Sequence, residues 1–347
     1  IWIYSQLPWI DIAAIDTLQF EQLNPLSYRW LNALLGSLLC LLAYFFAYAI
    51  WKNNNFALIV SFFVAIDGSL LVDSRFALAN VYIVFFGLSA LLCAAKSQSA
   101  DVNHRYWLLS SGVLLGIVAS VKWNGLGYLL VILSFFLALY SIQKIDRHEL
   151  RFTQTQINRL RTQKKINSNQ QKMSVINSVP QWEYLMYLIA VPLLVYVVIY
   201  IPDLQFNTQY GFLEKHQQQL GFHQTMVEAN EHPYCSKWYS WPFMIRPVGY
   251  FFSVTDALDT FGNKIELFQD VHLLPNPFLY WFSAIAILTM AIQWLKLFWK
   301  WINQGTVSHK FYLFMLILLG YFANFLPWAL VSRCVFLYQY QPASVFA

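Results

Sequence analysis

Four basic residues lie at the ends of very apolar segments, namely Arg75, Lys122, Arg246 and Arg333. Threading those segments through a bilayer places all four on one side, opposite the side that holds most of the Lys and Arg. Membrane proteins normally concentrate basic residues on the cytoplasmic side, so these exceptions indicate a functional requirement. Anion binding would meet it, and at a membrane surface a lipid-linked phosphate is the leading candidate.

The first two basic residues stand in short polar motifs. Arg75 ends the motif Asp67-Gly-Ser-Leu-Leu-Val-Asp73-Ser-Arg75, and Lys122 lies in Ser120-Val-Lys-Trp-Asn-Gly. We expect Asp67 about two helical turns below the outer surface, where a carboxylate is costly and usually functional, and on one helix face with Ser74. The alternatives are an Arg75 that reaches lipid headgroups, a structural Asp67, and a Lys-Trp anchor at the interface.

Aromatic residues accompany the third basic residue. His232, Trp238 and Trp241 precede Arg246 in a polar segment, and aromatic faces beside a guanidinium suit sugar and phosphate recognition. The alternative is an interfacial helix anchored by its Trp residues. The His spacing does not match a zinc site, and neither a phosphate-binding glycine loop nor a serine-hydrolase motif is present.

Membrane-spanning helices must position these residues. The chain is 58% hydrophobic and 11% charged, whereas soluble domains carry about 25% charged residues. Runs such as Leu34–Ile50 approach the roughly 20 apolar residues that cross a bilayer, so the composition predicts an all-α polytopic membrane protein with a large external loop. We expect spans near 28–50, 56–74, 77–95, 106–122, 125–142, 183–201, 277–299 and 311–331, with a possible ninth from about 334.

The loop 143–180 determines the orientation. It contains eight basic and two acidic residues, and placing it in the cytoplasm puts 14 of the 22 basic residues inside. The net charge of +5 therefore reflects cytoplasmic loops and does not indicate nucleic-acid binding. We divide the chain into an interfacial segment (1–25), an N-terminal transmembrane region (26–201), an external loop (202–276) and an incomplete C-terminal transmembrane region (277–347). Cys235 and Cys334 both fall outside, and whether they form a disulfide stays open.

These motifs together resemble the protein O-mannosyltransferase family, of the GT-C class of membrane glycosyltransferases, in its bacterial branch. The matching segments follow one another along nearly the whole chain: Tyr28-Arg-Trp-Leu-Asn-Ala-Leu, Asp67-Gly with Ser74-Arg75-Phe-Ala-Leu, Ser120-Val-Lys-Trp-Asn-Gly, Ser240-Trp-Pro-Phe-Met-Ile-Arg-Pro, and Leu326-Pro-Trp-Ala-Leu with Arg333 and Tyr338-Gln-Tyr-Gln-Pro.

The resemblance implies a GT-C-type helix bundle and an inverting, metal-independent transfer of mannose from polyprenyl or dolichyl phosphate to Ser or Thr of an exported protein. It implies that Arg75 binds the donor phosphate. From their positions and types we expect Lys122, Arg246 and Arg333 to bind the same phosphate or to shape its pocket, and Asp67 and Asp73 to be supporting acids. We place His232, Trp238 and Trp241 on the sugar or acceptor side.

The resemblance also places the catalytic Asp-Glu pair of the family, and its first span, before Ile1. The catalytic residues are therefore unknown here, and we expect a truncated chain that is inactive alone. No cofactor is expected. The expected partners are the bilayer, the lipid-phosphate donor and the acceptor protein, and an oligomer is a further option. The expected location is the bacterial plasma membrane, or the endoplasmic reticulum in a eukaryote, with the active face external or lumenal. The alternatives are a GT-C enzyme acting on a glycolipid and a membrane transporter.

Overall fold

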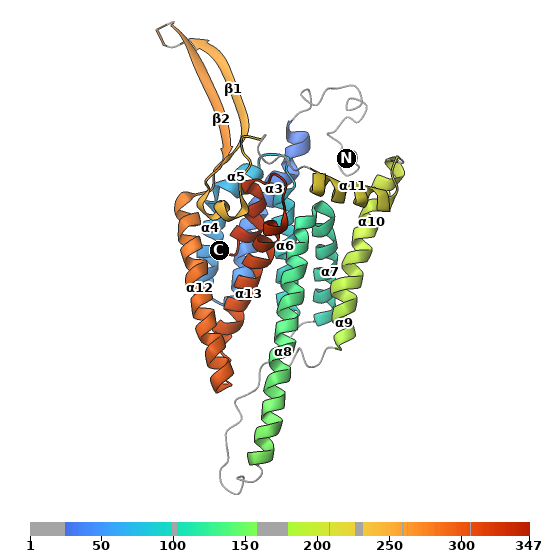
Figure 1. Cartoon of the computed structure of the whole chain (residues 1–347). Coiled ribbons are helices and arrows are strands. Elements are labelled where there is room, and N and C mark those ends of the chain that lie inside the picture. The colour runs from blue at the N-terminus through green and yellow to red at the C-terminus, as the bar shows by residue number, and fades with distance from the viewer. Residues whose placement is uncertain are drawn as a thin grey trace.

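A computed structural model describes residues 25–98, 103–157, 180–207, 209–225, 232–258, 260–261, 263–305 and 307–347. The chain forms a bundle of long helices that run roughly side by side, with a two-stranded hairpin rising from one end (Figure 1). Among the described residues, five helices are long and apolar enough to cross a membrane: Tyr28–Trp51, Trp123–Ile142, Trp182–Phe206, Pro277–Gln304 and His309–Leu330. The predicted helical membrane fold is confirmed.

The N-terminal part of the bundle contains a broken helix where one continuous span was predicted. Asp67 is the N-cap of the second piece and its side chain accepts the Ser69 backbone N–H, so the chain turns there and begins a new helix. The prediction of an uninterrupted helix over 56–74 was therefore wrong. The helices here are α3 (Pro25–Trp51), α4 (Asn54–Ala65), α5 (Gly68–Asp73) and α6 (Asn80–Lys96).

The middle of the bundle is closed by an ion pair at its predicted cytoplasmic end. Arg105 donates from Nε and Nη2 to the buried carboxylate of Glu183, at 3.1 and 2.8 Å, which joins α7 to α9. α8 continues as helix well past the predicted end at 142, into the predicted basic loop. The elements here are α7 (His104–Val121), a short 3-10 turn (Trp123–Gly125), α8 (Leu126–Ile157), α9 (Gln181–Leu185), a π-helical turn (Met186–Ala190) and α10 (Val191–Phe206).

The external segment contains β-structure that the sequence analysis did not predict. Strands β1 (Val248–Leu258) and β2 (Lys264–Leu273) pair antiparallel and extend away from the helices (Figure 1). Most of their side chains are exposed, while Val248 and Leu273 at the base are buried. The predicted all-α fold is therefore supplemented by a β-hairpin. Helix α11 (Phe212–Thr225) and a 3-10 helix (Trp238–Phe243) complete the segment.

The C-terminal part packs an aromatic cluster beneath the hairpin. Tyr340 is fully buried and lies against Trp241, Tyr280 and Phe325. The residues after 334 form short helices against the bundle, so the start of a ninth span predicted there is not observed. The helices are α12 (Pro277–Gln304), α13 (His309–Phe325), 3-10 turns at Leu326–Leu330 and Leu337–Tyr340, and α14 (Gln341–Ser344).

Two predicted features lie outside the described residues. These are nearly all of the interfacial segment 1–25 and residues 158–179 of the basic loop.

Candidate functional site

A buried carboxylate lies at the hairpin end of the bundle. Asp73, the last residue of α5, has no exposed surface. It accepts a hydrogen bond from the Tyr250 hydroxyl at 2.5 Å and another from Asn80 Nδ2 at 3.0 Å. Both donors satisfy an ionised carboxylate, which can only accept. The two donors therefore fix the orientation of the Asp73 carboxyl group at the base of the site.

Lys122 acts on this carboxylate, and Arg333 acts on Lys122. Lys122 ends α7 in an extended conformation (φ −167°, ψ 143°), and its Nζ lies 5.4 Å from the centre of the Tyr338 ring. Lys122 interacts electrostatically with Asp73 and with the like charge of Arg333, but it makes no ion pair within 4.0 Å among the described residues. One acid and two bases leave an excess positive charge, which suits an anionic ligand.

A disulfide braces the segment that carries Arg333. Cys235 and Cys334 are bonded, with their Cα atoms 5.4 Å apart. Arg333 donates to the carbonyl of Cys334 at 3.3 Å, and Arg246 donates to the carbonyls of Pro233 and Cys235 at 3.3 and 3.1 Å. The bond whose existence the sequence left open is therefore formed. Arg246 supports the disulfide loop, and the structure does not bring it to Lys122.

Arg75 is exposed, two residues beyond Asp73. The turn that carries it is fixed by the buried Asn32 of α3, whose Nδ2 donates to the carbonyls of Phe76 and Leu78, both at 2.8 Å. Gly36 allows the close approach, because a Cβ there would lie 2.3 Å from the Cβ of Ser74. Arg75 is therefore an exposed cation on the turn that directly follows α5 and its buried Asp73.

Asp67 has a different position from the one predicted. It is 4% exposed, and its carboxylate caps α5 and accepts the Ser69 hydroxyl at 3.0 Å. The helix breaks at Asp67, so it does not share a continuous helix face with Ser74. Asp67 and Asp73 are both buried, which favours supporting roles for both.

The aromatic residues predicted for the sugar or acceptor side separate into two groups. Trp241 is 1% exposed, its indole N–H donates to Ser236 Oγ at 2.8 Å, and no ring face is free for a sugar. Trp238 is half-buried against Phe325, and His232 is exposed, with its ring against Phe336. Trp241 is a core residue here, whereas Trp238 and His232 remain at the surface of the site.

Two residues of the site were missed by the sequence analysis. Tyr250 contacts Asp73, and Arg29 lies 5.1 Å from the centre of the Phe76 ring, which in turn packs against Tyr250. A signal for Tyr250 was available: Gly249 precedes it, and an isolated glycine in a strand often marks a bulge. Arg29 gave no local signal, because a basic residue at the start of a span is ordinary.

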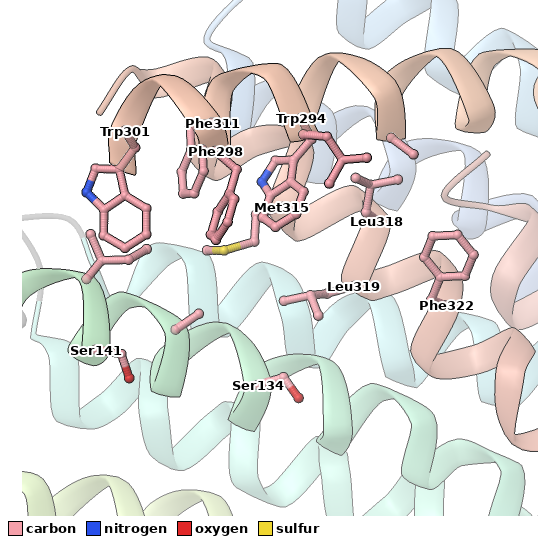
Figure 2. Close-up of a pocket in the computed structure, with 14 residues that line it drawn as sticks. Ser134, Ser141, Trp294, Phe298, Trp301, Phe311, Met315, Leu318, Leu319 and Phe322 are labelled. Carbon is pink, nitrogen blue, oxygen red and sulfur yellow. The ribbon is translucent and has the colours of Figure 1, made fainter. Parts of the chain in front are cut away.

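A separate apolar cavity of about 560 Å³ lies within the bundle. Figure 2 shows its aromatic lining from α12 and α13, with Trp294, Phe298 and Trp301 facing Phe311, and Ser134 and Ser141 on α8 opposite. None of the described residues that line it is charged. Such a cavity accommodates hydrocarbon and offers no polar path for an ion.

Models of one protein family match the chain throughout the region that forms the site. The family model described as dolichyl-phosphate-mannose-protein mannosyltransferase matches residues 4–207. The chain belongs to the protein O-mannosyltransferase family. A second model of the same family, its C-terminal four-transmembrane region, matches residues 208–347.

Bacterial relatives agree with this assignment. The polyprenol-phosphate-mannose–protein mannosyltransferases of Mycolicibacterium smegmatis and Corynebacterium glutamicum are 24% and 22% identical to this chain, over 88% of it and 61% of each relative. The dolichyl-phosphate-mannose–protein mannosyltransferase 6 of Saccharomyces cerevisiae is 30% identical over 30% of this chain and 15% of its own length. The chain spans about three fifths of the bacterial relatives.

One solved structure is similar in outline. The oligosaccharyltransferase AglB of Archaeoglobus fulgidus, solved with an inhibitory peptide and a dolichol-phosphate, has a TM-score of 0.45 and 16% sequence identity. The match covers 93% of this chain and 38% of AglB.

Proposed function

We propose that the complete protein transfers mannose from a polyprenyl phosphate to Ser or Thr hydroxyls of exported proteins. The observation that carries the proposal is that Lys122 interacts with both the cation of Arg333 and the buried acid Asp73, at the hairpin end of a membrane bundle of this family. Relatives that share both halves of the chain are named for this reaction.

The chemistry requires a cationic site of this kind. The acceptor oxygen attacks the anomeric carbon of mannose, the bond from that carbon to the phosphate oxygen breaks, and a carboxylate takes the hydroxyl proton. The departing lipid phosphate gains negative charge, which Lys122 and Arg333 stabilise where they stand. A single displacement inverts the anomeric centre, and the protein's own cations supply the charge without a metal. The base lies elsewhere than Asp67 and Asp73, because both are buried.

The disulfide supports an external or lumenal site. Disulfides persist in oxidising compartments such as the bacterial cell surface and the lumen of the endoplasmic reticulum, and Cys235–Cys334 lies beside Arg333. This agrees with the orientation inferred from the basic loop 143–180. The active face is therefore external for a bacterial plasma membrane.

Transfer of radiolabelled mannose from polyprenyl phosphate mannose to a Ser/Thr-rich peptide tests the proposal, with membranes that contain the complete protein. We expect labelled peptide, at least a tenfold loss with Arg75→Ala, and no loss with Lys264→Ala, an exposed cation on the hairpin. Label in a lipid fraction would favour a glycolipid acceptor. Absence of any transfer by an inserted, folded protein would contradict the proposal.

A further inference from the structure

The base of the hairpin contains a local irregularity that points a side chain into the site. The register pairs Gly249 with His272 and Phe251 with Val271, so Tyr250 is the extra residue of a β-bulge. Bulges bend a strand and change the direction of a side chain. Gly249 lets Tyr234 pack closely against the strand at this point, because a Cβ there would lie 2.4 Å from the Tyr234 hydroxyl.

The redirected side chain contacts the buried acid. The Tyr250 hydroxyl donates to Asp73 Oδ1, and its ring packs on Phe76 at 5.1 Å, beside the turn of Arg75. Burial and the neighbouring charge of Asp73 raise the pKa of Tyr250 well above its usual range, so the phenol remains a donor. Asn80 fixes the second oxygen, and Asp73 cannot rotate without losing a partner.

Asp73 interacts electrostatically with Lys122, one of the two cations of the proposed phosphate site. Lys122 is attracted by Asp73 and repelled by Arg333. Without Asp73 the two cations would separate, since like charges at close range repel strongly where water is scarce. Because Lys122 makes no ion pair within 4.0 Å among the described residues, it stays available to a ligand.

We propose that Tyr250 and Asp73 are positioning residues, which hold Lys122 beside Arg333 so that both cations contact one lipid-linked phosphate. This inference rests on the proposed function for the identity of the ligand. It adds Tyr250 to the site and gives the supporting acid Asp73 a defined task. It also makes the base of the hairpin part of the donor site, although the strands themselves lie outside the bundle.

The test compares Michaelis constants for donor and acceptor in the complete protein. Tyr250→Phe keeps the ring contact with Phe76 and removes the hydroxyl. We expect the KM for polyprenyl phosphate mannose to rise about tenfold, as for loss of a hydrogen bond to a charged group, with the acceptor KM unchanged. Asp73→Asn should raise the donor KM at least as much. The matched control is Tyr239→Phe, whose phenol lies on the same side and is 61% exposed.

The same substitution in a second variant protein distinguishes a positioning role of Tyr250 from general structural damage. In a Lys122→Met protein, Tyr250→Phe should change the donor KM less than twofold, because its effect acts through Lys122. An equal loss in both backgrounds, or no change in the wild-type background, would overturn the inference. Binding of polyprenyl phosphate alone is measured in parallel. Wild-type protein that binds this lipid with the expected Tyr250 dependence, but transfers no mannose, would overturn the proposed function and leave the positioning role supported.

Discussion

At the scale of single residues, the site depends on how buried charges are compensated. Asp73 receives two hydrogen bonds and interacts with the charge of Lys122, and removing a carboxylate from water without such partners would cost several kcal/mol. Asp67 is buried just as deeply, but its partners are Ser69 and a helix end. The two acids, six residues apart, therefore have different roles. Asp73 interacts with Lys122, and Asp67 caps the start of a helix.

The capping role of Asp67 gives a prediction about stability. Asp67→Ala removes the acceptor for the Ser69 backbone N–H and should lower the free energy of unfolding by about 1–2 kcal/mol, the usual cost of a lost N-cap. Asp67→Asn retains an acceptor oxygen and should stay within about 0.5 kcal/mol of wild type. Thermal unfolding in detergent distinguishes the two variants. Equal destabilisation by both would show that the charge matters and the cap does not.

At the scale of elements, the long helices could be predicted because they depend on composition. The helix break at Asp67 could not, because it depends on packing between distant segments. The long helices followed from continuous apolar runs, and observed and predicted ends agree closely for α3 and α6. The break at Asp67 did not follow from the apolar runs, because it depends on Gly68. A Cβ at Gly68 would lie 2.2 Å from the carbonyl oxygen of Leu274. That contact joins residues far apart in the chain, and no local pattern reveals it.

The hairpin was missed for a related reason. Its strands combine Phe251 and Phe252 with scattered charges and do not alternate cleanly between apolar and polar residues, as a half-buried strand would. Most of its side chains are exposed, so burial left no pattern to detect. The basic residues of the site were predicted because charge at the end of an apolar run is conspicuous, whereas Tyr250 and Asn32 were not, since their roles arise only from long-range contacts.

At the scale of the whole molecule, two independent features support the proposed orientation. The positive-inside preference favours a cytoplasmic position for the basic loop, and the disulfide favours an oxidising compartment for the other end of the bundle. The bundle places them at opposite ends, since α8 runs from the Lys122 turn toward the loop (Figure 1). The cavity in Figure 2 lies inside the bundle between them, and its apolar lining suits a protein that handles a lipid and not an ion.

This orientation predicts where thiols can be labelled. In intact cells, a membrane-impermeant maleimide should not label Cys235 or Cys334 before reduction, because they are bonded, and should label both after an external reductant is added. Cys93 is buried and should stay unlabelled, while Cys40→Ala removes the remaining free thiol as a control. Labelling that appears only after the cells are opened would place the site in the cytoplasm.

The central claim is that Lys122 and Arg333 hold one phosphate together. A double-mutant cycle tests it directly, with binding of polyprenyl phosphate to the purified complete protein measured for wild type, Lys122→Met, Arg333→Met and the double variant. We expect each single change to weaken binding about tenfold or more. The double variant should lose less binding free energy than the two single variants lose together, with a coupling energy of about 1 kcal/mol or greater. Wild-type binding by either single variant, or losses that add within about 0.3 kcal/mol, would contradict a shared phosphate site.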